Sequence, residues 1–194
     1  MNKQREHLYG IVFTGMMAAI VFVTTYFLKI EIMTPAGPAM LKVGNAMCLL
    51  GGMLFGGLYG GLAAGIGSAL FDLTNPLFTP SAPFTLVFFF LMSFVCGAIA
   101  NARGQNGKNI RLNIIAAVSG AALYWLLNIG KSVVTLMLAG SAFYPAMLAN
   151  AWKMITSGVN AVIGVAVSVL LAIPLTMALD RAGTMGKIRK WPKI

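Results

Sequence analysis

Apolar runs long enough to cross a lipid bilayer make up most of this chain, and short polar segments separate them. Hydrophobic residues account for 59% of the 194 residues and charged residues for only 9%, against roughly 25% in soluble domains. A transmembrane helix needs about 20 apolar residues, and residues 9–28 form such a run after a basic start. No convincing cleavage site of small residues follows that run, so we expect a span and not a cleavable signal. The composition predicts a single-domain integral membrane protein.

The apolar runs predict an all-α bundle of six transmembrane helices. Residues 43–73 are too many for one span, because a helix of that length would extend about 46 Å through a core of about 30 Å. We therefore expect two short spans with a turn near the glycines at 56–61. The last run is long enough that it must tilt, kink near Pro174 or project beyond the core. The predicted spans are residues 9–28, 43–57, 58–73, 83–102, 112–138 and 145–179.

The basic residues predict the orientation of these spans. With six spans, the basic residues of the N-terminal segment, of the loop at 103–111 and of the tail at 180–194 share one side. Short basic loops stay cytoplasmic, so both termini are expected in the cytoplasm. The tail, with Trp191 among lysines, is expected to anchor at an anionic lipid surface. This clustering beside spans also explains the net charge of +10 without a nucleic-acid partner.

Two lysines, Lys131 and Lys153, lie inside predicted spans. A lysine at membrane depth costs about 2.5–3.5 kcal/mol on insertion scales, so it usually faces a cavity, a partner or a ligand. Each lies about two turns from the outer end of its span, and helical periodicity places polar residues on the same face. These faces hold Tyr124, Asn128, Lys131 and Thr135 in the fifth span, and Asn150, Lys153, Ser157 and Asn160 in the sixth.

We expect the two polar faces to form a ligand pocket, with Asp72 at the outer end of the third span as a nearby carboxylate. In the alternative, each lysine extends its ammonium to the outer interface, or pairs with Asp72 for a structural purpose. The asparagines and hydroxyls beside the lysines favour the pocket, because such groups gain nothing from facing lipid. Tyr124, Trp125 and Trp152 would stack a flat ring, although the tryptophans fit equally well as interfacial anchors.

The sequence lacks the residues for several kinds of catalysis. Its single histidine, His7, precedes the first span, Asp72 is the one carboxylate expected within the membrane, and no GxxxxGK[ST] loop occurs. These facts argue against a histidine triad, an intramembrane zinc site, a carboxylate pair and a P-loop ATPase. Cys48 and Cys96 have no metal-site spacing, and we expect them to pack in the core. We therefore expect no catalytic residue, no metal and no cofactor.

Small residues recur at four-residue spacing in the first three predicted spans. Such residues let helices approach closely in lipid. We expect most of them to make contacts within the bundle and the rest to dock another membrane protein. The ladders are Gly15/Ala19, Gly52/Gly56/Gly60 and Gly57/Gly61/Gly65.

Three stretches, LKVGNAMCLLGGMLFGGLYGGLAAGIGSALFDL, YWLLNIGKSVV and WKMITSGVNAVIGVAVSVLLAIPL, carry a family resemblance. Together with the six spans and the chain length, they make the sequence similar to the substrate-binding S components of energy-coupling factor (ECF) vitamin transporters. The resemblance is closest to the riboflavin-transporter-like subgroup, and it extends from the first span to Pro174. It implies a multi-pass protein of the bacterial plasma membrane that captures a vitamin without catalysis.

In that family the pocket lies between spans four to six, under a lid formed by the loop between spans one and two. The lid maps to residues 34–42 of this chain. The implied pocket walls are Asn128, Lys131, Asn150, Lys153 and Asn160. Transport in the family requires a membrane T component and two cytoplasmic ATPases, and small residues on span one dock the T component. These map to Gly15 and Ala19, although the family often has alanine where this chain has Gly15.

The identity of the ligand stays open at this stage. An excess of lysine over carboxylate favours an anionic or acceptor-rich vitamin such as pantothenate or a flavin, while pyridoxine and pyrimidine precursors also fit. Two other functions remain as alternatives. A stand-alone secondary transporter or channel is one, although the two halves show no inverted repeat. A membrane scaffold without transport activity is the other.

Overall fold

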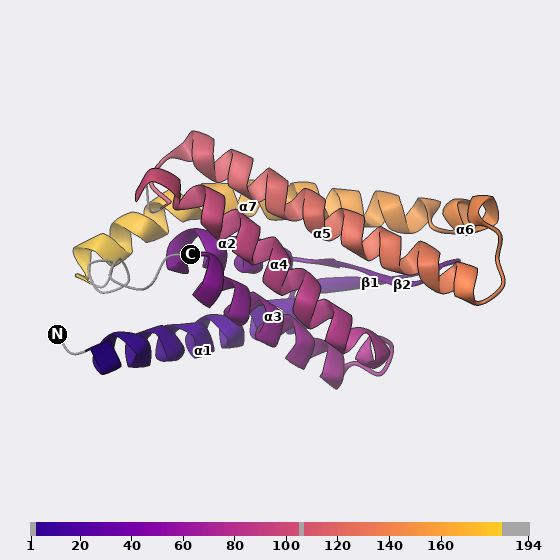
Figure 1. Cartoon of the computed structure of the whole chain (residues 1–194), viewed down its shortest axis with the longest axis horizontal. Coiled ribbons are helices and arrows are strands. Elements are labelled where there is room, and N and C mark those ends of the chain that lie inside the picture. Colours follow the sequence, from indigo (N-terminus) through magenta and orange to yellow (C-terminus); the bar gives the residue numbers. More distant parts are fainter. Residues whose placement is uncertain (1–2, 105–106, 184–194) are drawn as a thin grey trace.

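In the computed structural model, residues 3–104 and 107–183 are described, without the side chains of residues 3–7 and of Arg103. Trp191 and the other tail residues from 184 onward lie outside the described residues, as does the side chain of His7. The helices of the described part run largely along one axis (Figure 1). They are α1 (Lys3–Phe27), α2 (Gly44–Phe55), α3 (Gly57–Thr74), α4 (Ala82–Ala100), α5 (Ile110–Leu138), α6 (Phe143–Ala149) and α7 (Ala151–Arg181).

Within the described residues, four helical segments are long and apolar enough to cross a membrane. They are Leu8–Phe27, Thr79–Ala100, Ile110–Leu138 and Ala151–Arg181. Helices α2 and α3 are shorter, at 12 and 18 residues, and Gly56 joins them with a φ of 83°. Glycine adopts this conformation without strain, which explains a sharp turn within the predicted glycine stretch. The start of α1 and the end of α7 lie at one end of the bundle, and α6 lies at the other (Figure 1).

The first connection is a β-hairpin, which the all-α prediction did not include. Strands β1 (Lys29–Thr34) and β2 (Gly37–Lys42) pair antiparallel, with Lys29 opposite Lys42. The segment KIEIMT alternates isoleucine with polar residues, a period of two that indicates a strand. This strand pattern spans only six residues between two long apolar runs, and it was not recognised from the sequence. The predicted lid at 34–42 therefore consists of the hairpin turn and β2.

The predicted sixth span is also divided, because Asn150 separates α6 from α7. The Asn150 side chain donates from Nδ2 to the Ala146 carbonyl at 2.9 Å. Asparagine side chains compete in this way with regular helical hydrogen bonding. Helix α7 then continues through Pro174 to Arg181. The predicted span 145–179 is therefore formed by two helices.

The glycine ladders of α2 and α3 hold the bundle together. A Cβ atom on Gly60 would lie 2.6 Å from the backbone of Gly51, and one on Gly97 would lie 2.5 Å from the nitrogen of Gly57. Only hydrogen side chains permit this approach, so these glycines make contacts within the bundle. By contrast, a Cβ atom on Gly15 would meet nothing within 4 Å.

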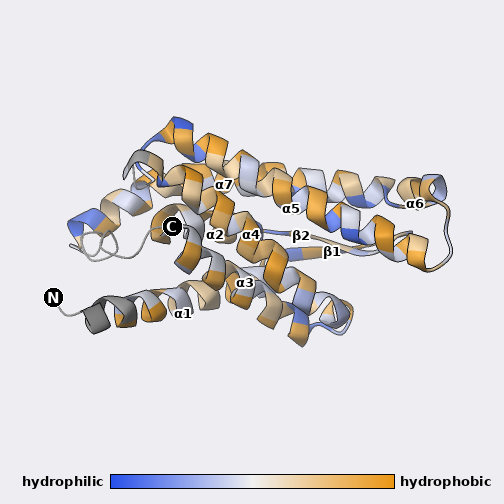
Figure 2. Ribbon diagram, in the orientation of Figure 1, coloured by the Kyte–Doolittle hydropathy of each residue, from blue (hydrophilic) through white to orange (hydrophobic). Residues whose placement is uncertain are grey.

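The hydropathy of the surface agrees with a membrane environment. Hydrophobic residues cover the middle of the long helices, while hydrophilic residues gather toward the two ends (Figure 2). Many large apolar side chains on these helices are exposed, among them Val162 at 70% and Leu170 at 73%. Such exposure is costly in water and is expected where lipid surrounds a helix.

Candidate ligand-binding site

A cavity of about 240 Å³ lies at the hairpin end of the bundle, between β2, the end of α3, α4, α5 and α7. One part of its wall is aromatic, and another is polar. The aromatic lining consists of Phe78, Phe84, Phe88, Phe89 and Tyr124. The polar lining includes Lys42, Asp72, Ser81, Thr85, Asn128, Lys131, Ser132, Thr135, Lys153, Ser157 and Asn160.

All but one of the site residues predicted from the sequence line this cavity. Those that do are Asp72, Tyr124, Asn128, Lys131, Lys153, Ser157 and Asn160. Asn150 does not, because it is fully buried at the junction of α6 and α7. Its Nδ2 bonds to Ala146, and its buried Oδ1 has no hydrogen-bond partner.

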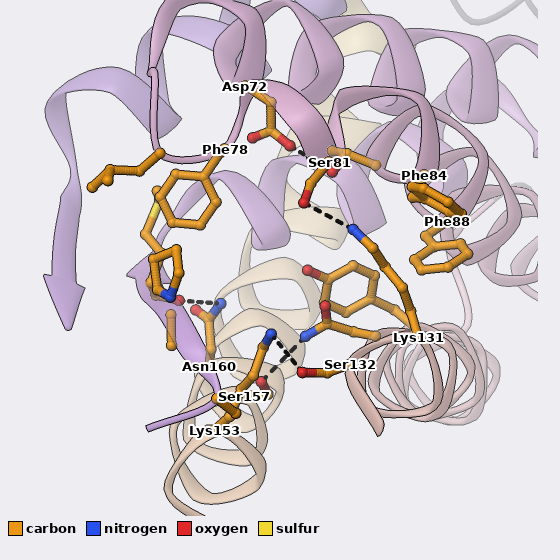
Figure 3. A pocket seen from close by; sticks show the side chains of 18 of the residues that line it. Asp72, Phe78, Ser81, Phe84, Phe88, Lys131, Ser132, Lys153, Ser157 and Asn160 are labelled. Carbon is orange, nitrogen blue, oxygen red and sulfur yellow. Dashed lines mark hydrogen bonds between the residues drawn. The ribbon is translucent and has the colours of Figure 1, made fainter. Parts of the chain in front are cut away.

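Lys131 reaches into the cavity from α5 (Figure 3). Its Nζ donates to the Ser81 hydroxyl at 2.8 Å and lies 4.4 Å from the centre of the Phe84 ring. Ser81 ends the short 3-10 turn that precedes α4. An ammonium over an aromatic face is favourable, so this lysine is held by one hydroxyl and one ring.

Lys153 enters the same cavity from α7 (Figure 3). Its Nζ donates to the Ser132 hydroxyl of α5 at 3.1 Å. Beside this contact, Asn128 donates to the Ser157 hydroxyl at 3.4 Å. The two predicted polar faces therefore look toward each other across the α5–α7 interface.

The two lysines have no carboxylate partner in the described part of the chain. The ion pairs found there join Lys29 to Glu31 and Lys108 to Asp180. No carboxylate oxygen thus lies within 4 Å of the Lys131 or Lys153 ammonium among these residues. This geometry disfavours the alternative in which either lysine forms a structural ion pair with Asp72.

Asp72 and Lys42 lie deep in the cavity wall. Asp72 is 3% exposed and accepts a hydrogen bond from the Thr85 hydroxyl at 2.5 Å. Lys42 is 9% exposed, and its Nζ lies 4.6 Å from the centre of the Phe89 ring. Burial lowers the pKa of the Lys42 ammonium, and the nearby charge of Asp72 opposes that effect.

The hairpin is fastened over the cavity on two sides. On one side, Asn160 accepts from the Lys42 amide at 3.1 Å and donates to the Met40 carbonyl at 3.4 Å. On the other, Asn75 donates to the Glu31 carboxylate at 2.7 Å. The hydrogen bond from Lys29 to Glu31 also holds the pKa of that carboxyl below its usual range. Asn160 therefore uses both polar atoms of its side chain to contact the hairpin.

Several residues that line the cavity were not predicted from the sequence. Ser132 was detectable, because it follows Asn128 by four residues on one helical face. Ser81 and Thr85 show the same spacing near the start of α4. The phenylalanines could not be assigned to the cavity from the sequence, because aromatic residues in an apolar helix usually face lipid or the core. Trp125 and Trp152 do not line the cavity: the Trp125 indole donates to the Met154 carbonyl at 3.1 Å, and Trp152 is 65% exposed.

The described residues contain no group of three histidine, cysteine or carboxylate side chains placed to hold a metal ion. What they form is a partly enclosed cavity with hydrogen-bond donors, acceptors and aromatic rings. Such a cavity suits the binding of a small polar molecule with a flat apolar part.

Comparison with known proteins supports this interpretation. The family model of the ECF-type riboflavin transporter S component matches residues 7–180, which include every element around the cavity. Searches of curated proteins and of solved structures gave no significant match. With its apolar helices, the protein is a multi-pass membrane protein. The chain belongs to the ECF-type riboflavin transporter S-component family, whose members are substrate-binding subunits of transporters.

Proposed function

We propose that this protein captures a small vitamin or vitamin precursor at the outer membrane face and delivers it to an ATP-driven importer of the ECF type. The observation that carries the proposal is the cavity under the hairpin, where Lys131 and Lys153 converge with an aromatic wall. The basic loops favour an orientation in which both termini lie in the cytoplasm of a bacterial cell. The hairpin then faces outward.

The aromatic wall suits a ligand with a flat ring, and the family model is named for riboflavin transport. Tyr124 and Phe89 lie with their ring centres 4.5 Å apart, so they form one aromatic surface. A flavin is therefore the first candidate, and pantothenate, pyridoxine and pyrimidine precursors follow. The cavity volume of 240 Å³ is slightly below the range of about 300–1,000 Å³ for pockets of drug-sized ligands, which favours a small vitamin.

The partners are proposed to be a membrane T component and two cytoplasmic ATPases. Gly15 and Ala19 are exposed on α1, and a side chain on Gly15 would meet nothing inside the protein. Such a smooth strip lets another helix approach closely. We expect Gly15→Trp to abolish co-purification with the T component while leaving ligand affinity unchanged. Gly130→Trp on α5, also at an open glycine, is the matched control.

The ligand is identified by purifying the protein from vitamin-containing medium and analysing bound small molecules by mass spectrometry. Titration with the candidate vitamins follows. We expect at least one to bind with submicromolar affinity, and Lys153→Met to abolish binding while the protein stays folded. Lys108→Met, at an ion pair away from the cavity, should bind normally. If no vitamin copurifies and none binds more tightly than micromolar, the proposal is wrong.

A further inference from the structure

The charges around the cavity do not balance. Among the described residues, its lining holds three lysines, Lys42, Lys131 and Lys153, but only one carboxylate, that of Asp72. Charges removed from water usually have a compensating partner, because an unpaired charge in a medium of low dielectric constant is costly. In an open pocket, water solvates the excess positive charge. In a closed pocket that holds a ligand, the ligand has to compensate that charge.

The Asp72 carboxylate accepts a hydrogen bond from Thr85 of α4 and not from a lysine of the cavity. The negative charge of Asp72 acts on Lys42 and on Lys131, and the like charge of Lys131 acts on Lys153. The hydrogen-bond partners of Lys131 and Lys153 are the neutral hydroxyls of Ser81 and Ser132. Neither of these two ammonium groups, which enter the cavity from α5 and α7, therefore has an anionic hydrogen-bond partner among the described residues.

The two ammonium groups also have donors to spare. A lysine ammonium carries three N–H donors, and the hydrogen bond to a serine uses one of them on each lysine. The remaining donors are available to a ligand, since both side chains point into the cavity from different helices (Figure 3). Hydrogen bonds between two charged groups are roughly twice as strong as those between neutral groups.

We propose that the ligand carries an anionic group, a carboxylate or a phosphate, that binds between the ammonium groups of Lys131 and Lys153. This inference rests on the proposed function and specifies the chemical class of its ligand. The flat part of the ligand then lies against the aromatic wall. Lys42, buried at the end of β2 with its Nζ over the Phe89 ring, is not part of the proposed anion site.

The test compares pairs of compounds that share a skeleton and differ in charge. The pairs are riboflavin 5′-phosphate with riboflavin, pantothenate with pantothenol, and pyridoxine 5′-phosphate with pyridoxine. Each compound is titrated against the purified full-length protein by calorimetry at low and at high ionic strength. The anionic member of the tightest-binding pair should bind at least tenfold more tightly than its neutral partner, a difference of 1.4 kcal/mol.

Two variants test where this selectivity arises. We expect Lys131→Met and Lys153→Met each to weaken binding of the anionic compound by at least tenfold and to reduce the preference within the pair. Lys108→Met, at the ion pair with Asp180 outside the cavity, should keep the preference. The comparison in the unmodified protein needs no variant, so it decides the question even where a substitution prevents folding.

The possible results separate the two proposals. If a neutral vitamin binds as tightly as its anionic counterpart, or more tightly, the anionic ligand is refuted and vitamin capture stands. If none of the compounds binds and no small molecule copurifies, both proposals are refuted. An anionic preference that survives both substitutions would refute the assignment to Lys131 and Lys153.

Discussion

Asn160 is the residue whose replacement most directly tests how the hairpin closes the cavity. Its Oδ1 accepts from the Lys42 amide at 3.1 Å, and its Nδ2 donates to the Met40 carbonyl at 3.4 Å. Leucine has a similar volume and branches at the same atom, but it can form neither bond. Asn160→Leu should therefore release β2 from α7 without leaving a large void.

The expected size of the effect follows from these two contacts. The 3.4 Å bond is longer than the usual 2.7–3.2 Å, so it contributes little. The bond to the Lys42 amide is buried, and its loss leaves a donor without a partner, which costs about 1–3 kcal/mol. That free energy corresponds to a roughly 5- to 150-fold increase in the open population of the hairpin. Apparent ligand affinity should fall by up to the same factor if only the closed form binds.

Hydrogen–deuterium exchange followed by mass spectrometry measures this opening without a ligand. Peptides covering β2 should exchange at least fivefold faster in Asn160→Leu, while peptides from α4 should not change. Val162→Leu, two residues away on α7 and 70% exposed, is the control and should behave as the unmodified protein. Unchanged exchange in β2 of a folded Asn160→Leu protein would refute the view that Asn160 fastens the hairpin.

Three further predictions concern packing, pH and a surface charge pair. Gly97→Ala should lower the free energy of unfolding by about 1–3 kcal/mol, because its Cβ would meet the backbone of α3 at 2.5 Å. Gly130→Ala, whose Cβ would lie in open space, should not lower it, and equal melting temperatures of the two variants would contradict this prediction. The pKa of Glu31 lies below its usual value, so its stabilising contact is complete above about pH 4.3 and is lost as the pH falls through the native value. Hydrogen–deuterium exchange in β1 should then accelerate in the unmodified protein and accelerate less in Glu31→Gln. Coincident pH profiles of the two proteins would contradict this prediction. Asp180→Asn removes the partly exposed ion pair with Lys108. The free energy of unfolding should fall by less than about 1 kcal/mol, and this difference should disappear in high salt. A larger fall, measured by chemical denaturation, would show a structural role of the pair.

Local sequence patterns were sufficient for the class of protein and for much of the pocket. Runs of apolar residues predicted a membrane protein because the bilayer sets the length of each span. Helical periodicity placed Asn128 with Lys131, and Lys153 with Ser157, because residues three or four positions apart share a face in any regular helix. These inferences needed no knowledge of the neighbouring helices. The glycine ladders likewise indicated close packing, although the sequence did not say which partners they contact.

Other features depended on contacts between distant parts of the chain. Asn160 meets Lys42 across 118 positions, and its role in holding the lid is invisible to periodicity. Asn150 lies between α6 and α7, outside the cavity lining, and its side chain bonds to the Ala146 carbonyl. The sequence by itself determined which helical faces are polar, since that is a property of local geometry. Only the tertiary structure decided which polar residues face the cavity and which support it, because packing assigns each side chain its partner.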